Sequence, residues 1–243
     1  APGLVFALLY LLVRDYKTVD LTPQLNQVTQ SIGGTLKHIF GVLARTPTLR
    51  WVCLGAAMQV IVVSAIWSWL PSFLNRFDGV APAQAGKLAA LVILAGAFGA
   101  FLWGFVIDRL SIRNPRSKLS LLSVLCLVSM VILMYAFNGP LVGSAQLNVI
   151  IVGGLFMTCT VGVVVGVVMD VVHPGVRSTG GAVLALFQNL LGLAVGPFLV
   201  GVLSDWWGLR QAMAVIPLSS ILAALFFMMA ARSYENDAAP VAG

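Results

Sequence analysis

Long stretches without a charged residue constrain the fold of this chain more than any other feature. These stretches cover residues 51–75, 88–107, 119–169, 178–204 and 211–231. A helix needs about 20 apolar residues to cross the hydrocarbon core of a bilayer. The third stretch is long enough for two crossings, and Asn138, Gly139 and Pro140 near its middle favour a turn between them. The sequence therefore predicts an all-α, polytopic membrane protein with a bundle of six transmembrane helices.

The composition agrees with lipid as the main solvent. The 243 residues are 60% hydrophobic and 9% charged, whereas soluble domains contain about 25% charged residues. We expect spans at about residues 51–72, 86–107, 118–137, 146–170, 178–203 and 210–231, which form a bundle over 51–231. The remaining segments are interpreted as the end of a preceding transmembrane helix (1–13), a cytoplasmic central loop (14–50) and a cytoplasmic tail (232–243).

The basic residues indicate the orientation of the bundle. The net charge of +6 does not mark a nucleic-acid partner, because the basic residues cluster at alternate ends of the spans. If the segment before Trp51 is cytoplasmic, eleven Lys and Arg residues lie on that side and three, Arg76, Lys87 and Arg210, lie on the other. By the positive-inside rule the carboxyl terminus is cytoplasmic, and the resemblance described below favours a bacterial inner membrane.

The polar segment before the first span has helical periodicity of its own. Apolar residues recur at helical spacing between residues 24 and 43, which predicts an amphipathic helix on the cytoplasmic membrane surface, either continuous or broken at Gly33 and Gly34. Cys53, Cys126 and Cys159 lie inside apolar runs without a ligand cluster nearby. We therefore expect them to be packing residues, with no cofactor and no metal.

Small residues recur every four positions within the spans. The sets are Gly96, Ala100 and Gly104; Gly162 and Gly166; and Gly192 and Gly196, which Pro197 and Gly201 follow. Such stripes let helix backbones approach closely in a membrane. They fit ordinary bundle packing, and they also fit helices that slide or rock during a transport cycle.

A charged pattern marks the exit of the second span. Gly104 precedes Asp108, Arg109 and Arg113 in the order Gly-x-x-x-Asp-Arg-x-x-x-Arg. An acidic side chain here could accept hydrogen bonds from these basic residues or from the amino terminus of a neighbouring helix. Such charged contacts would hold the helix ends together at the membrane surface. The positive-inside rule alone also explains the basic residues.

This pattern resembles the cytoplasmic signature of the major facilitator superfamily, in the copy between helices eight and nine. Ser111 departs from it, because the family places Gly at that position. The block from Arg177 through Gln188, Asn189, Gly196 and Pro197 to Asp205 and Gly208 is similar to helix eleven of the family. The resemblance implies the carboxy-terminal half of a secondary transporter, helices seven to twelve, whose amino-terminal half would be a partner. Trp69-Leu70-Pro71 and His173-Pro174-Gly175 look most like spinster-like transporters and their bacterial relatives, which implies an amphiphilic, lipid-like substrate.

Two groups of polar residues are the candidate functional positions. Asp170, at the end of the fourth span, could reach Arg109 or Arg113, so we expect a cytoplasmic gate formed by Gly104, Asp108, Arg109, Arg113, Asp170 and Arg177. Polar residues deeper in the spans either join helices by hydrogen bonds or line a substrate cavity near the midplane. These are Gln59, Ser64, Trp67, Thr158, Thr160, Gln188 and Asn189.

The sequence thus favours a transporter half, in contact with membrane lipid and a small-molecule substrate, over two alternatives. A membrane-embedded transferase would need an acid and a histidine at an interface, for which only Asp170 and His173 are candidates. The other alternative is a structural half-transporter that does not transport. We expect no catalytic residues.

Overall fold

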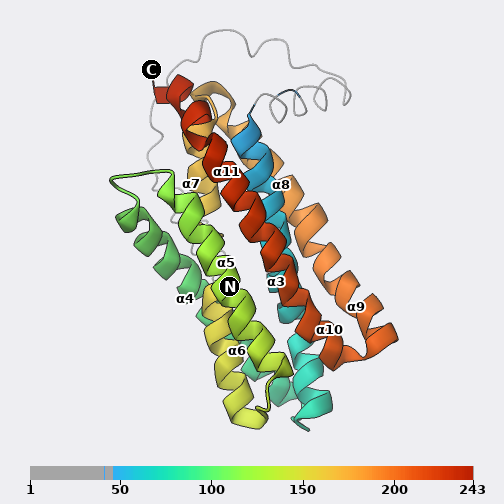
Figure 1. Cartoon of the computed structure of the whole chain (residues 1–243). Coiled ribbons are helices and arrows are strands. Elements are labelled where there is room, and N and C mark those ends of the chain that lie inside the picture. The colour runs from blue at the N-terminus through green and yellow to red at the C-terminus, as the bar shows by residue number, and fades with distance from the viewer. Residues whose placement is uncertain (1–40, 42–45, 243) are drawn as a thin grey trace, which may run out of the picture. The chain divides into compact units, whose positions relative to one another are not determined.

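The computed structural model describes Gly41 and residues 46–242, and these residues form helices without a β-strand (Figure 1). The chain divides into two units, residues 1–36 and 37–243, and every element described below belongs to the second. The expected helix end at 1–13 and, apart from Gly41, the amphipathic helix at 24–43 lie outside the described residues. The elements are α3 (Pro47–Phe77), α4 (Pro82–Leu110), α5 (Ser117–Asn138), α6 (Gly143–Met157), α7 (Val163–Val171), η2 (Pro174–Val176), α8 (Arg177–Phe187), η3 (Gln188–Leu193), α9 (Val195–Trp207), α10 (Leu209–Val215), η4 (Ile216–Leu218) and α11 (Ser219–Ala242).

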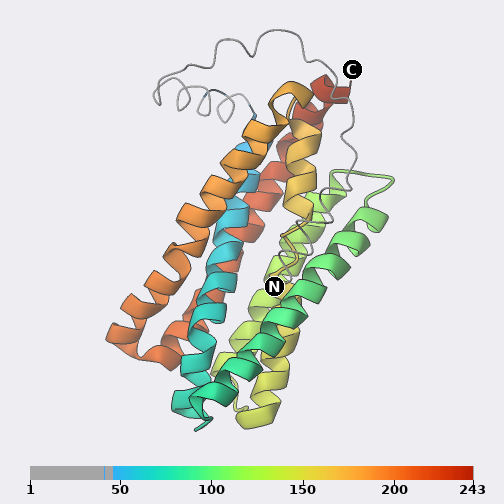
Figure 2. The ribbon, with the colours of Figure 1, turned by 180° about the vertical axis from the view of Figure 1, so that it is seen from behind.

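These elements make six antiparallel crossings, which confirms the predicted fold class (Figure 2). Five helical stretches are long and apolar enough to span a bilayer: Pro47–Phe77, Pro82–Leu110, Ser117–Asn138, Pro174–Trp207 and Leu209–Ala238. The remaining crossing is built from two shorter pieces, α6 and α7. A helical bundle satisfies backbone hydrogen bonds within each span, as the lipid interior requires.

The first and last helices run beyond the expected spans. Helix α3 begins at Pro47, which has no N–H that needs a partner at the first helical position, and it ends before Gly79, which has a φ of +64°. Helix α11 continues to Ala242, so the expected tail at 232–243 begins as a helix. The end of α11 therefore belongs to the folded bundle.

The fourth crossing is interrupted by a turn between Met157 and Val163, where the sequence predicts one continuous helix. Hydrogen bonds in both directions join this break to neighbouring helices. Gln59 Nε2 donates to the Met157 carbonyl at 3.0 Å, and Thr158 Oγ1 donates to the Gly96 carbonyl at 2.7 Å. A helix break inside a membrane is tolerated when such groups replace the missing partners.

The fifth crossing also departs from a regular α-helix. Residues Gln188–Leu193 form a π-helical turn, in which the Ala194 N–H donates to the Asn189 carbonyl at 3.0 Å. Ser64 Oγ of α3 donates to the Gly192 carbonyl at 3.2 Å. The fourth and the fifth crossings thus each receive a hydrogen bond from α3.

Helix α3 is the centre of the bundle. Its most apolar window is 72% buried, compared with 22% for α4. Buried side chains form two apolar clusters, one around Leu49, Cys53 and Phe227 and one around Phe73 and Phe137. Along α3, α5 and α11, polar residues separate the two clusters, and these are Gln59, Ser129 and Ser220. We call this group the central polar layer.

Two of the expected small-residue positions hold α9 and η3 closely against α3. A Cβ added to Gly192 would lie 2.7 Å from Val60 Cβ, and one added to Gly196 would lie 2.6 Å from the Ile61 carbonyl and overlap Ser64 Oγ. A Cβ at Gly201 would make an ordinary 3.6 Å contact with Trp69. By contrast, no described atom lies within 4 Å of a Cβ added at Gly104, Gly162 or Gly166.

We predict that Gly196→Ala lowers the free energy of unfolding of the bundle by about 1–3 kcal/mol, because the added methyl group must displace the α3 backbone. Gly166→Ala is the matched control, and it should be neutral or slightly stabilising because its Cβ meets open space. Denaturant unfolding of the chain in detergent micelles measures both. Equal stability of the two variants would contradict the close contact between α9 and α3.

Candidate functional site

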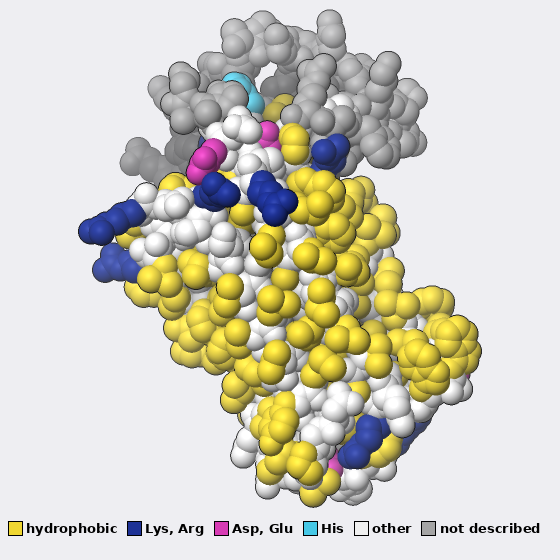
Figure 3. Space-filling model, in the orientation of Figure 1, with side chains coloured by type: hydrophobic (Ala, Val, Ile, Leu, Met, Phe, Trp, Pro, Cys, Tyr) yellow, Lys and Arg dark blue, Asp and Glu magenta, His cyan; other side chains and the backbone are white. Residues whose placement is uncertain are grey.

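Charged residues gather at the two ends of the bundle, and apolar side chains cover the face between them (Figure 3). The end that contains the start of α3, the end of α4, the start of α5 and the end of α11 is called the basic end. Its described Lys and Arg residues are Arg50, Arg109, Arg113, Arg116, Lys118, Arg177 and Arg232. The opposite end has Arg76, Lys87 and Arg210.

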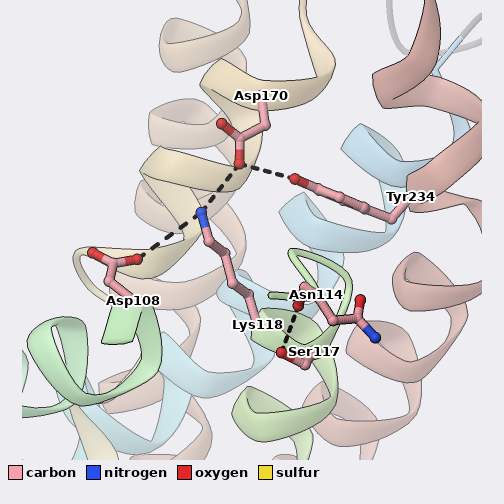
Figure 4. Close-up of polar contacts among 6 residues, drawn as sticks. All are labelled: Asp108, Asn114, Ser117, Lys118, Asp170 and Tyr234. Atoms are coloured by element: carbon pink, nitrogen blue, oxygen red, sulfur yellow. Dashed lines mark hydrogen bonds and ion pairs between the residues drawn. The ribbon is translucent and has the colours of Figure 1, made fainter. Parts of the chain in front are cut away.

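Lys118 joins two acidic residues at the basic end (Figure 4). Its Nζ lies 3.3 Å from Oδ2 of Asp170 on α7 and 3.9 Å from Oδ1 of Asp108 on α4. The Lys118 side chain is 20% exposed, whereas that of Asp108 is 70% exposed. The pair with Asp170 is therefore the stronger of the two, because exposed ion pairs are weakened by water. One lysine on α5 thus connects the ends of α4 and α7.

The last turns of α11 add further polar contacts at the basic end. Tyr234 Oη donates to Oδ2 of Asp170 at 3.0 Å, and Oδ2 of Asp237 accepts from the Thr48 N–H at 2.7 Å. Glu235 lies 3.8 Å from Arg116, where both side chains are exposed. These contacts bring the end of α11 against α3, α5 and α7.

In the structure the two acidic residues share a partner other than the expected arginines. Asp108 and Asp170 are brought together through Lys118, and the described residues give neither of them an ion pair with Arg109 or Arg113. Arg109, Arg113 and Arg177 are exposed, and Gly104 lies in open surroundings. The long Arg side chains leave the helix end toward solvent, while Lys118 begins the next helix on the side that faces α7.

The sequence does not mark Lys118 or Tyr234 as functional positions. Lys118 looked like one of many basic residues that follow the positive-inside rule, and Tyr234 lay beyond the last expected span. The available signal in the sequence is the position of Lys118 immediately before an apolar run, with the acid Asp170 at the end of another run.

Deeper in the bundle, Gln59 is the centre of a hydrogen-bond network. Its Nε2 donates to Ser129 Oγ at 3.3 Å and to the Met157 carbonyl, while its Oε1 accepts from Ser220 Oγ at 2.9 Å. The Gln59 side chain is fully buried. These contacts tie α3 to α5, α6 and α11, so the amide joins helices in this structure.

The other expected cavity residues differ in their surroundings. Ser64 and Thr158 use their hydroxyl groups in bonds to backbone carbonyls, and Thr160 is buried. Gln188 is half-buried, and Asn189 is exposed with its amide donating to Ala185. Trp67 differs from them all, because its indole N–H is buried without a hydrogen-bond partner among the described residues.

Among the described residues, neither a hydrogen bond nor an ion pair joins Asp170 to His173, the acid and histidine that a transferase would need. Asp170 binds Lys118 and Tyr234, while Nδ1 of His173 accepts from the Gly175 N–H at 3.3 Å. These residues contain no group of three His, Cys, Asp or Glu side chains that could hold a metal ion. The three cysteines are free thiols buried within the apolar cluster at the basic end.

The chain is similar in sequence to known membrane transport proteins. The protein-family model described as Major Facilitator Superfamily matches residues 1–197. "Protein spinster homolog 3" of Danio rerio is 23% identical over 242 residues, which cover 87% of this chain and 47% of that protein. An "MFS-type efflux pump" of Mycolicibacterium smegmatis is 27% identical over 207 residues, which cover 80% of this chain and 47% of the pump. The chain spans about half the length of these curated relatives.

Solved structures support the same fold. A bacterial homolog of the human lysosomal transporter Spinster, in an inward-facing and unoccupied conformation, matches with a TM-score of 0.76 and 22% identity. This match covers 98% of the present chain and 58% of the homolog. The inward-facing, occupied conformation matches with a TM-score of 0.70. At this level of identity the likeness shows the shared fold.

We predict that Gln59→Leu lowers the free energy of unfolding by about 1–3 kcal/mol, since hydrogen bonds between membrane helices contribute on average about 0.6 kcal/mol each. The substitution removes the bonds to Ser129, Met157 and Ser220. Gln84→Leu, at an exposed position in the first turn of α4, serves as the control and should change stability by less than about 0.5 kcal/mol. Denaturant unfolding in micelles measures the difference, and similar values would exclude a structural role for the network.

Proposed function

This chain belongs to the Major Facilitator Superfamily, and from that membership we propose that it forms one six-helix half of a secondary transporter. The family match over residues 1–197 carries this proposal, and the length of the relatives supports a second half as the partner. The transporter moves a small organic or amphiphilic solute by alternating access, in which the two halves rock about a central site. Neither a chemical reaction nor a cofactor is part of this proposal.

Exposed apolar surface supports a partner half and surrounding lipid. Large hydrophobic side chains are exposed along α4, where Phe98, Phe101 and Phe105 are 59%, 75% and 60% exposed. Leu190 and Phe198 of the fifth crossing are likewise exposed. Apolar surface of this extent requires either lipid or another protein surface. In our proposal the amino-terminal half covers one part of it and lipid covers the rest.

The distribution of charge supports a cytoplasmic basic end. Most of the described Lys and Arg residues lie there, as the positive-inside rule expects of the cytoplasmic side. Both the start of α3 and the end of α11 are then cytoplasmic. The proposed location is a bacterial inner membrane.

The polar network around Lys118 forms the proposed cytoplasmic gate. Lys118 holds Asp108 and Asp170 together, so separating α4 from α7 exposes an acid that has lost its counter-ion. Partly exposed ion pairs of this kind can stabilise, by about 1 kcal/mol, the conformation in which α4 and α7 are held together. Arg109, Arg113 and Arg177 belong to the surrounding basic surface in this proposal, and Gly104 leaves room beside it.

The substrate site is proposed near Trp67, Gln188 and Asn189. The indole N–H of Trp67 is a buried donor that has no partner within the described part of the chain, and such a donor favours a ligand that can accept its hydrogen bond. The apolar composition of the spans suits an amphiphilic solute. The spinster relatives support the same class of substrate only through the family resemblance.

Transport should require both halves, since the central site lies between them. We predict that proteoliposomes with the chain joined to its amino-terminal half take up substrate, whereas the six-helix chain alone does not.

A thermal-shift screen in nanodiscs against sphingosine, a lysophospholipid and a hydrophilic organic anion identifies the substrate class. A ligand at 100 times its Kd should stabilise the protein by about 2.7 kcal/mol. Uptake by the chain alone, or a response only to the hydrophilic anion, would contradict the proposal.

We predict that Lys118→Gln slows substrate exchange about two- to fivefold in proteoliposomes, as expected for the loss of up to about 1 kcal/mol. The neutral side chain leaves Asp108 and Asp170 to repel each other, so the gate closes less well. Lys87→Gln, an exposed position at the opposite end, is the matched control and should exchange at the unaltered rate. A rate unaffected by Lys118→Gln would remove this lysine from the gate.

A further inference from the structure

The last turns of α11 make a set of contacts that the gate itself does not explain. Within residues 233–237, Ser233, Tyr234, Glu235 and Asp237 contact α3, α5 and α7. We call this segment the terminal clasp. We propose that the terminal clasp is part of the gate, with Tyr234 as the positioning residue that orients the Asp170 carboxylate toward Lys118.

Tyr234 and Lys118 converge on the same oxygen atom. Tyr234 Oη donates to Oδ2 of Asp170 at 3.0 Å, and Lys118 Nζ donates to that oxygen at 3.3 Å (Figure 4). A carboxylate oxygen has two lone pairs, so it can accept both bonds together. Each donor restricts rotation of the Asp170 side chain. The tyrosine hydroxyl therefore holds the carboxylate where the lysine binds it.

Packing holds the ring of Tyr234 in place independently of the hydrogen bond from its hydroxyl group to Asp170. The residue is 5% exposed and belongs to the apolar cluster that includes Leu49, Leu119 and Phe227. Because the ring is packed, the hydroxyl group points in one direction. The side chain therefore loses little further conformational entropy when the hydrogen bond to Asp170 forms. This geometry makes Tyr234 suitable as a rigid support for the Asp170 carboxylate.

The neighbouring residues fix the backbone of the clasp. Helix α3 lacks a side-chain cap from Thr46, and Asp237 of the clasp accepts from the Thr48 N–H instead. The amino terminus of a helix attracts a carboxylate through its unpaired N–H groups and its partial positive charge. Thr48 Oγ1 also donates to Ser233 Oγ at 3.0 Å. The clasp is thus anchored on α3, the central helix, by the residue before Tyr234 and by a residue one turn after it.

These contacts connect the end of the chain to the gate. Movement of α11 away from α3 would withdraw Tyr234 from Asp170, and the ion pair with Lys118 would then lose its fixed geometry. This inference rests on the proposed gate for its role in transport. Its structural content can be tested without a substrate.

The test measures how readily Lys118 reacts with a membrane-impermeant N-hydroxysuccinimide ester, in the full chain reconstituted in lipid nanodiscs. Peptide mass spectrometry reports the labelling of Lys118 relative to Lys87, an exposed lysine at the opposite end that serves as an internal reference. Tyr234→Phe keeps the packed ring and removes only the hydroxyl. Tyr135→Phe, at an exposed tyrosine of α5, and Asn236→Ala, at an exposed position between two clasp residues, are the controls.

We expect Tyr234→Phe to raise the Lys118-to-Lys87 ratio about threefold, because a charge-assisted hydrogen bond to Asp170 is lost. Both controls should leave the ratio unchanged. Asp170→Ala should raise the ratio by itself, and adding Tyr234→Phe to it should have no further effect. An unchanged ratio in Tyr234→Phe would overturn the proposal, as would a full additional rise in the Asp170→Ala background. A chain that never transported substrate would still give either result, so failure of the clasp and failure of the transporter proposal are distinguishable.

Discussion

The absence of water in the bilayer core is the constraint on which the rest of this structure depends. Every backbone group that a span leaves unpaired must find a partner inside the bundle. Three of the six crossings contain an irregular turn, and α3 supplies donors to the fourth and the fifth, through Gln59 to the Met157 carbonyl and Ser64 to the Gly192 carbonyl. The central position of α3 follows from this requirement as much as from its apolar surface.

The ends of the bundle follow different rules from its interior. Water is available there, so single ion pairs contribute little, and specificity comes from several contacts that share atoms. Asp170 illustrates this, because Lys118 and Tyr234 from two different helices bind one of its oxygens. The basic end is thereby organised around an acid, although basic residues outnumber acidic ones there.

The fold was predictable because length and hydropathy determine transmembrane spans almost directly. Six crossings, their order and the asymmetry of charge follow from runs of uncharged residues. The interruptions near Thr158 and Gln188 were not predictable, since hydropathy does not distinguish a regular helix from one whose carbonyls bind another span. The partners of Asp170 were also missed, because proximity between Lys118, Asp170 and Tyr234 arises from packing of segments 52 and 64 residues apart.

The central polar layer has a mechanical consequence for the bundle. It separates two apolar clusters, and the breaks in the fourth and fifth crossings contact α3 between Ala57 and Ser64, close to the same level. A packed cluster resists compression and shear, whereas a helix without its regular ladder of hydrogen bonds has low bending stiffness. The fourth and fifth crossings are therefore the ones that bend most easily at this level, while α3, α4 and α5 run through it as unbroken helices.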